Sequence, residues 1–263
     1  HIINAVKKHK IVDYERFMVI AIDALGNGVS ISPSNYNGEM PVFSIEDMVH
    51  SQYKMLSEVL GIDNIYAIVG GSMGSFQTFQ WLVSYPDFVE KAVPYVCSPV
   101  RTSSDKLWLN LEKDIILVQD AHDVPRGETQ RIINLLTAYI AKTQNHLSRE
   151  VDTDAFSEYY NNFTAVESKP FTLDNRLSQI NAMLQHDITR EFDHSLEKAA
   201  QAVKADLLII VSDSDQIVNP QPALEFAELT GAELLILSNE CGHLAPSCDM
   251  EKFTAAIQEF LKQ

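Results

Sequence analysis

The chain has 263 residues, 46% of them hydrophobic, so it can bury the core of one large α/β domain or of a domain with a substantial insertion. Its formal net charge of −16 repels polyanions and opposes binding to nucleic acid or to anionic lipid. No apolar run reaches the roughly 20 residues that a membrane-spanning helix requires, so we expect neither nucleic acid nor a membrane as partner.

Five apolar, β-branched or aromatic segments predict strands, at residues 17–22, 65–69, 91–96, 206–211 and 233–237. Helical patterns separate these segments, an order typical of βαβ units around a mostly parallel sheet. The nearly continuous apolar character of the strands indicates that helices cover both faces of the sheet. The predicted fold class is therefore α/β.

Helix boundaries can also be predicted in the core. Ser44, with Asp47 three residues later, forms a capping-box pattern at the start of a helix. The apolar residues that follow at roughly helical spacing predict one buried face: Met48, Tyr53, Leu56, Val59 and Leu60. A second helix is predicted after Ser72 and a last one over residues 250–261.

Residues 102–202 interrupt this alternation, because they contain several helical patterns and no clear strand. The predicted α/β core is thus divided into residues 1–101 and 203–263. We expect the helical insertion to lie over the carboxyl edge of the sheet, where ligands bind in open α/β folds, and to act as a lid.

A candidate nucleophile lies in the sequence Gly-Gly-Ser-Met-Gly at residues 70–74, between a predicted strand and a predicted helix. The pattern G-x-S-x-G in that context is typical of a nucleophile elbow, with Ser72 on a sharp turn. A side chain at Gly70 or Gly74 is expected to clash with the adjoining strand or helix. The backbone N–H of Met73 is the expected oxyanion-hole donor. The alternative is a glycine-rich turn that closes an ordinary βα unit.

Two later loops supply a candidate acid and base. Asp213 and Asp215 follow the fourth predicted strand, and His243 follows the fifth. A serine hydroxyl needs a base to take its proton, and the imidazole needs a carboxylate to fix its tautomer. The chain order Ser, Asp, His is that of hydrolases with this fold. The alternatives are a loop histidine satisfied by backbone and an aspartate that caps a helix.

Several segments together resemble the homoserine O-acetyltransferase family of the α/β-hydrolase superfamily. They include "DALGNGVSISPSN", "IVGGSMGSFQ", "QHDI" with Asp187, and "GHLAP", and extend from Asp23 to Pro246. The resemblance implies that Ser72 attacks acetyl-CoA and carries the acetyl group. His243 would be base and then acid. Asp215, in a D-x-I-V-x-P pattern, would be the orienting carboxylate.

The resemblance also implies the partners of the reaction. We expect a small-molecule acyl donor, acetyl-CoA or another acyl-CoA, as co-substrate, a small-molecule hydroxyl acceptor, and no bound cofactor. Members of the family are often dimers through their lids, so a homodimer is compatible with the resemblance. No nucleotide-binding glycine motif is present.

The sequence departs from the family in the region that would hold an amino-acid acceptor. Leu244 stands where the family usually has an aspartate. A Tyr-Arg-Ser motif of the family lid is replaced by a stretch with Gln144 and Asn145, and Arg101 or Arg149 would have to compensate. The substrate-binding candidates are therefore Arg101, Gln144 and Leu244, and a carboxylic-ester hydrolase is the alternative function.

A third departure concerns the start of the sequence. In the family, a second oxyanion donor and a strand beside residues 65–69 come from segments upstream of the point that matches His1. We therefore expect the sequence to be a piece of a longer gene product that lacks the N-terminal strands. The same departure supports a further alternative, a non-catalytic hydrolase-like binding protein.

Three cysteines, at positions 97, 241 and 248, are few and odd in number. They favour a reducing compartment over a disulfide framework, so we expect a cytoplasmic protein. Cys241, His243 and Cys248 are metal-binding residue types, but their spacing fits no common zinc pattern, and we expect no metal site.

Overall fold

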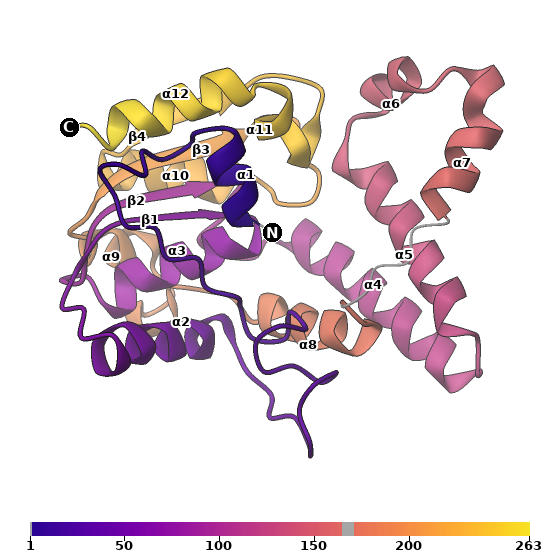
Figure 1. Cartoon of the computed structure of the whole chain (residues 1–263), viewed down its shortest axis with the longest axis horizontal. Helices are drawn as coiled ribbons and strands as arrows, with labels where there is room; N and C mark the ends of the chain where they lie inside the picture. Colours follow the sequence, from indigo (N-terminus) through magenta and orange to yellow (C-terminus); the bar gives the residue numbers. More distant parts are fainter. Residues whose placement is uncertain (1, 165–170) are drawn as a thin grey trace.

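A sheet of four parallel strands organises the core of the computed structural model, which describes residues 2–164 and 171–263 (Figure 1). The strands lie in the order β1 (Ile65–Gly71), β2 (Val89–Tyr95), β3 (Asp206–Ser212) and β4 (Glu233–Leu237). Gly71 lies opposite Tyr95, and Tyr95 lies opposite Ile210. Because all four strands run in the same direction, the loops that follow them meet at one edge of the sheet.

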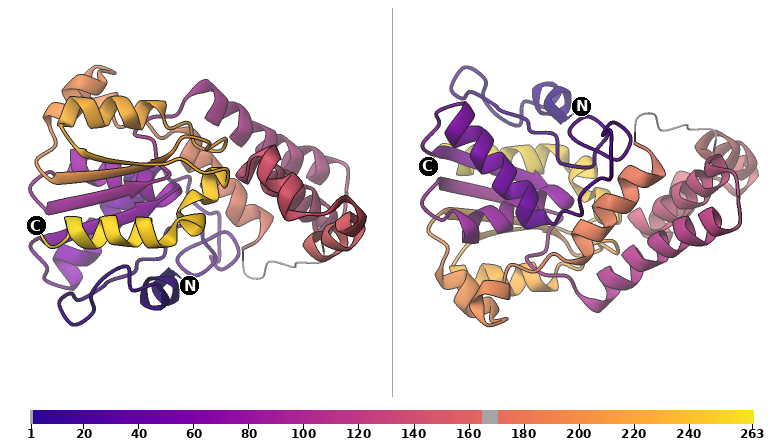
Figure 2. Two further views of the ribbon diagram at one scale, coloured as in Figure 1. Left: turned by 90° about the horizontal axis from the view of Figure 1, so that it is seen from above. Right: turned by 90° about the horizontal axis from the view of Figure 1, so that it is seen from below.

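Helices cover both faces of this sheet (Figure 2). The helices are α1 (Ile2–Lys8) and α12 (Met250–Phe260) on one face, with α3 (Met73–Ser84), α9 (Leu196–Gln201) and α10 (Gln221–Thr230) on the other. In β3, Ile209 and Val211 pack toward α3 and α10, while Leu208 and Ile210 pack toward α12. This alternation follows from the two-residue period of a strand, and it buries both faces.

The helix α2 (Ile45–Lys54) begins at the predicted capping box, which the structure confirms. The Asp47 N–H donates to Ser44 Oγ at 3.1 Å, and the Ser44 N–H donates to Asp47 Oδ2 at 2.8 Å. The following turn, η1 (Met55–Val59), is a π-helix. Its wider turn shifts the helical period, so Val59 is 75% exposed and Leu60 is also exposed, and their predicted burial is wrong.

The helical insertion lies between β2 and β3 and projects beyond the carboxyl ends of the strands (Figures 1 and 2). Its helices are α4 (Ser103–Ala121), α5 (Arg126–Ala141), α6 (Gln144–Glu150), α7 (Phe156–Thr164) and α8 (Leu173–Leu184). A separate apolar cluster joins α4, α5 and α8: Leu109, Ile116, Ile133, Leu173 and Ile180. The remaining helices of the described residues are η2 (Thr153–Ala155), η3 (Arg190–Phe192), η4 (Gly242–Leu244) and α11 (Ala245–Cys248).

The two ends of the insertion meet where they leave the core. Val100 and Asp187 form an isolated antiparallel bridge, and the Ile188 N–H donates to the Pro99 carbonyl at 3.3 Å. Asp187 itself accepts hydrogen bonds from the N–H and hydroxyl of Thr189, which lower its carboxyl pKa although partial burial opposes them. This bridge is one of the points at which the insertion is tied to the core.

One predicted strand is wrong. Residues 17–22 have no strand structure, and Met18 in this segment is 80% exposed. Strand-forming residues make a strand only by pairing, and within the described residues no neighbouring strand pairs with this segment. The other four predicted strands are confirmed to within two residues. None of the helices in the described ranges has both the length and the apolar character that a bilayer crossing requires.

Candidate active site

Ser72 occupies a strained turn between β1 and α3. Its backbone dihedral angles are φ 53° and ψ −122°, a conformation that non-glycine residues rarely adopt. The Ser72 N–H donates to the Tyr95 carbonyl at 3.1 Å, which ties the turn to the end of β2. Such strain persists only where the surroundings enforce it, and it is concentrated at functional sites.

The glycines around Ser72 differ in whether a side chain would fit at their positions. A Cβ at Gly70 would lie 2.4 Å from the Gly74 carbonyl oxygen, and one at Gly71 would lie 2.1 Å from the Tyr95 ring. A Cβ at Gly74 would meet nothing within 4 Å, so the expected clash at that position is wrong. The close approach is made by the Gly74 backbone against Gly70, which requires no glycine at position 74.

The structure brings Ser72, His243 and Asp215 into one hydrogen-bonded chain, called here the Ser–His–Asp relay. His243 Nε2 lies 2.9 Å from Ser72 Oγ, and His243 Nδ1 lies 2.7 Å from Asp215 Oδ2. An ionised carboxylate only accepts, so Nδ1 carries the proton and Nε2 presents its lone pair to the serine. This arrangement can remove a proton from Ser72 Oγ.

The Asp215 carboxylate is held rigidly. Its side chain is 1% exposed, and its Oδ1 accepts hydrogen bonds from the N–H groups of Ile217 and Val218 at 2.9 and 3.0 Å. Asp213, the other candidate acid, is exposed to solvent. Of the two aspartates, the structure therefore places Asp215 against the histidine.

Met73 is the first residue of α3. The first N–H groups of a helix have no partner within the helix, so the Met73 N–H is available to a ligand beside Ser72. Its side chain packs against the apolar cluster that includes Phe43 and Phe76. The expected role of Met73 in an oxyanion hole stays a prediction.

The loop that carries His243 differs from the sequence prediction. Cys241 and Cys248 form a disulfide, which contradicts the expectation of unpaired cysteines, and Cys97 is the free, buried cysteine. The small odd number of cysteines gave no indication that two of them, seven residues apart, form a pair. Because His243 lies between the two sulfurs in sequence, the disulfide closes a short loop around the base.

The helical insertion packs directly on this loop. The N–H and hydroxyl of Thr143 donate to the Glu240 carbonyl at 3.1 and 2.9 Å. Gly242 has φ 58°, and a Cβ there would lie 2.6 Å from the Ala141 carbonyl oxygen. The junction between α5 and α6 therefore contacts the backbone that positions His243, a contact with no signal in the sequence.

The three predicted substrate residues have different environments. Leu244 follows His243 and is 40% exposed. Gln144 is exposed at the start of α6, and its amide donates to the Tyr139 hydroxyl at 2.9 Å. Arg101 is buried, with its guanidinium over the Phe76 ring. The structure does not gather these three side chains into one binding site.

Asp105 was missed by the sequence analysis. Its Oδ1 accepts from the Asn219 N–H, and its Oδ2 accepts from the Thr102 N–H, each at 2.9 Å. Asp105 therefore connects the start of α4 with the loop that carries Asp215. The signal was present in the Thr-x-x-Asp pattern of residues 102–105, which forms a second capping box.

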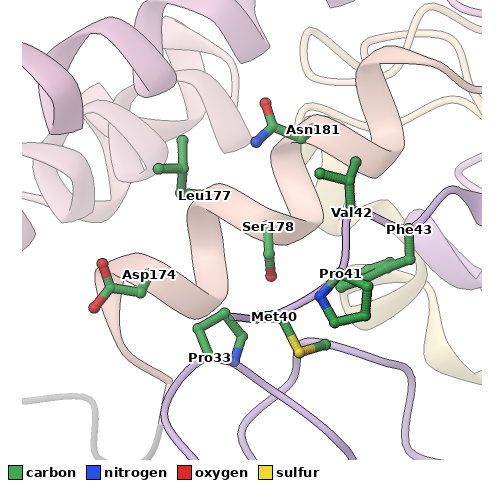
Figure 3. Close-up of a pocket in the computed structure, with 9 residues that line it drawn as sticks. All are labelled: Pro33, Met40, Pro41, Val42, Phe43, Asp174, Leu177, Ser178 and Asn181. Atoms are coloured by element: carbon green, nitrogen blue, oxygen red, sulfur yellow. The ribbon is translucent and has the colours of Figure 1, made fainter. Parts of the chain in front are cut away.

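A pocket of about 260 Å³ lies between α8 and the loop that precedes α2 (Figure 3). Its lining residues among those described are Pro33, Met40, Pro41, Val42, Phe43, Asp174, Leu177, Ser178 and Asn181. In Figure 3, Leu177, Ser178 and Asn181 come from the helix, and the residues from 33 to 43 face them from the loop. The lining does not include the residues of the Ser–His–Asp relay, so this pocket is separate from them.

Comparisons with known proteins agree with this fold. A family model described as alpha/beta hydrolase fold matches residues 2–247. A probable esterase of Corynebacterium glutamicum is 26% identical over 274 aligned residues, covering 96% of this chain and 77% of that protein. A homoserine O-succinyltransferase of Neisseria meningitidis serogroup B is 24% identical over 294 aligned residues, covering 98% and 77%.

Two solved structures, one of an esterase and one of an acyltransferase, superpose on this chain. The acetyl esterase MekB superposes with a TM-score of 0.80 at 23% identity, over 90% of this chain and 75% of that chain. A homoserine O-acetyltransferase from Bacillus anthracis superposes with a TM-score of 0.76 at 20% identity, over 89% and 70%. At these identities the superpositions show a shared fold.

Proposed function

The chain belongs to the alpha/beta hydrolase fold family, and from that premise we propose that it hydrolyses carboxylic esters through an acyl-enzyme on Ser72. Its relatives include esterases and acyltransferases, and transfer of an acyl group is common to both reactions. The observation that carries the proposal is the Ser–His–Asp relay, with its distances of 2.9 and 2.7 Å.

Acylation begins at the serine. His243 Nε2 accepts the proton of Ser72 Oγ while that oxygen attacks the ester carbonyl carbon. Asp215 accepts the hydrogen bond from Nδ1 and stabilises the imidazolium that forms. The Met73 N–H, at the start of α3, would donate to the developing oxyanion. The imidazolium then returns its proton to the leaving alkoxide, and the acyl group stays on Ser72.

Deacylation repeats these steps with water. His243 takes a proton from a water molecule, the resulting hydroxide attacks the acyl carbon, and Ser72 Oγ leaves with the proton that the imidazolium returns. The products are a carboxylic acid and the free enzyme.

Water is favoured over an amino acid as acceptor by the side chains near His243. Leu244 offers no charge to an ammonium group. Arg149 is paired with Glu240, and Arg101 is buried with its guanidinium over the Phe76 ring, so neither position offers an exposed, unpaired arginine to a substrate carboxylate. A zwitterion without partners in a closed site would lose its hydration without compensation.

The helical insertion would act as a lid over the acyl group. Its position beyond the carboxyl ends of the strands and its contact with the His243 loop support this role. The acyl-CoA co-substrate, a homodimer and a cytoplasmic location stay predictions.

Hydrolysis of p-nitrophenyl acetate tests the proposal. We expect turnover by the parent chain, and a loss of kcat of at least about 10³-fold in Ser72→Ala, because the nucleophile is removed while the fold is kept. Equal rates for the parent and Ser72→Ala would contradict a role for Ser72.

A second candidate is an acyltransferase that uses homoserine. The segments that resemble the homoserine O-acetyltransferase family favour it, and a homoserine O-acetyltransferase of Methanobrevibacter ruminantium is 38% identical over 110 aligned residues, which cover 38% of this chain. Release of free CoA from acetyl-CoA that depends on added homoserine would support this candidate. Release that is independent of homoserine would support hydrolysis.

A non-catalytic binding protein is the remaining alternative. A fluorophosphonate probe reacts with serines that are activated by a relay of this kind. Stoichiometric labelling at Ser72 would exclude the binding-protein alternative, whereas absence of both labelling and turnover would support it.

A further inference from the structure

The hydroxyl of Ser214 joins the two loops that carry the candidate acid and the candidate base. Ser214 precedes Asp215 in the loop after β3, and its Oγ donates to the Asn239 carbonyl at 2.5 Å. The same oxygen accepts from the Gly242 N–H at 3.2 Å. Asn239 and Gly242 belong to the loop after β4 that carries His243. One side chain therefore makes two hydrogen bonds from the acid loop to the base loop.

The hydrogen-bonding capacity of this hydroxyl is filled. A serine hydroxyl donates one hydrogen bond and accepts two. The Asn239 carbonyl only accepts, so it takes the Ser214 proton, and the Gly242 N–H only donates, so it uses one lone pair of Oγ. Ser212 Oγ lies 3.3 Å from Ser214 Oγ and supplies the donor for the second lone pair. A side chain without a hydroxyl at position 214 would leave each of these three groups without this partner.

The contact with Gly242 fixes the backbone immediately before the base. Gly242 is buried and has φ 58°, and the backbone of Ala141 packs closely on it. A buried N–H that loses its hydrogen bond is costly, so the chain moves to find another partner when the hydroxyl is removed. Any such movement at Gly242 displaces His243, which is the next residue.

The hydrogen bond from Gly242 to Ser214 lies beside that of the relay. Ser214 and Asp215 are neighbours on one loop, and Gly242 and His243 are neighbours on the other, so two adjacent residues of each loop are paired. The other oxygen of Asp215 accepts from N–H groups of its own loop, which orient the carboxylate but do not hold the base loop against it. The Ser214 hydroxyl supplies contacts of that second kind.

The base loop has internal contacts that do not involve Ser214. Asn239 Oδ1 accepts from the Cys241 N–H at 2.9 Å, and Asn239 Nδ2 donates to Asp249 Oδ2 at 2.7 Å. The disulfide between Cys241 and Cys248 closes the same segment. These contacts shape the loop from within, so we expect loss of the Ser214 hydroxyl to shift the loop relative to Asp215 without unfolding it.

We propose that Ser214 is a positioning residue for the reaction at Ser72, whose hydroxyl holds the backbone of the base loop so that the His243 imidazole stays aligned between Asp215 and Ser72. The inference rests on the proposed function, because it gives Ser214 a role in acyl transfer. Ser214 acts through the backbone of Gly242 and not by contact with the reacting atoms.

The first test is the hydrolysis of p-nitrophenyl acetate by Ser214→Ala and Ser214→Thr. The concentration of active sites is counted by fluorophosphonate labelling of Ser72, so loss of folded protein does not lower the measured kcat. We expect kcat of Ser214→Ala to fall by about 10-fold with KM within about twofold of the parent, because alignment of the base is lost and substrate binding is kept. Ser214→Thr keeps a hydroxyl and should recover most of kcat.

Ser57→Ala is the matched control. Ser57 is also a partly buried serine, and its Oγ donates to the Tyr53 carbonyl at 2.8 Å on the far side of α2 from its start at Ser44. Its loss removes a comparable hydrogen bond outside the two loops, so kcat should equal that of the parent. Ser214→Ala with the same kcat as the parent and Ser57→Ala would overturn the proposal. A rise in KM with kcat unchanged would also overturn it, because binding rather than alignment would have been lost.

A second measurement does not depend on activity. Hydrogen–deuterium exchange of the Gly242 N–H reports its hydrogen bond directly. We expect exchange at least about 10-fold faster in Ser214→Ala, with the parent rate kept in Ser214→Thr and Ser57→Ala. Equal exchange in Ser214→Ala and the parent would overturn the proposal. A parent chain that does not hydrolyse the ester would refute the proposed function, and the exchange would still test whether Ser214 holds the base loop.

Discussion

Gly70 and Gly74 flank the same serine, yet only Gly70 is sterically required. We expect Gly70→Ala to lower the free energy of unfolding by about 2 kcal/mol or more, because the new Cβ meets backbone atoms that cannot move aside. Gly74→Ala adds a methyl group in open space on α3 and is expected to be neutral or stabilising by up to about 1 kcal/mol. Urea titration of both variants gives the comparison, and equal destabilisation would contradict the steric assignment.

His186 makes the stability depend on pH. Burial and the charge of Arg101 lower its pKa from 6.5 to about 3 on folding, so below pH 6.5 the unfolded chain binds a proton that the native protein does not. The stabilisation is therefore present above pH 6.5 and is lost as the pH falls toward 3, at about 1.4 kcal/mol per pH unit.

His186→Gln removes this dependence. Between pH 6 and pH 4.5 we expect its free energy of unfolding to fall less steeply than that of the parent, by about 1.4 kcal/mol per unit. Unfolding at a series of pH values measures the slopes. His122→Gln, at an exposed histidine, should keep the parent slope. Identical slopes in His186→Gln and the parent would show that His186 is not buried in its neutral form.

Among the elements, the disulfide changes how the His243 loop is held. In denaturant without reductant, we expect one reactive thiol per chain, that of Cys97, and three after reduction. Cys248→Ser should lower the free energy of unfolding by about 2 kcal/mol, because a closed loop of this length restricts the unfolded chain. It should also lower kcat, since the loop carries the base. Three reactive thiols before reduction would contradict the disulfide.

The same elements show what the sequence could predict. Four strands and the α2 capping box followed from local patterns, since buried parallel strands and helix caps have strong signatures. Residues 17–22 have strand-forming composition, but pairing is a non-local property that composition does not contain. The π-turn at η1 could not be predicted either, because the spacing of the apolar residues does not indicate one extra residue in a turn.

For the candidate site, contacts between residues far apart in the sequence also limit what can be predicted. Ser72, Asp215 and His243 were predictable because each follows a strand, and the carboxyl ends of parallel strands converge. Arg101 was predicted as a substrate residue, and its burial over Phe76 was not foreseen. That environment depends on the packing of Arg101 against α3, and no local pattern encodes such a contact.

At the scale of the whole molecule, the net charge of −16 bears on the choice of acyl donor. A CoA thioester is an anion and is repelled by this field, whereas p-nitrophenyl acetate is neutral. Raising the ionic strength from about 0.02 M to about 0.2 M shortens the screening length and should raise kcat/KM for acetyl-CoA about twofold or more. The value for the neutral ester should stay constant. A fall in kcat/KM for acetyl-CoA would indicate a local cationic site that overrides the field.

The bridge between Val100 and Asp187 has a consequence for how such molecules diversify. Because the chain leaves and rejoins the core at this bridge, residues gained or lost within the helical insertion do not alter the register of β2 against β3. The whole helical insertion can therefore be exchanged, by natural variation or by a graft from a relative, without a change in the strands of the core. The serine, acid and base stay on the core, provided that the hydrogen bonds of Thr143 and Asp105 to the loops that carry His243 and Asp215 are kept.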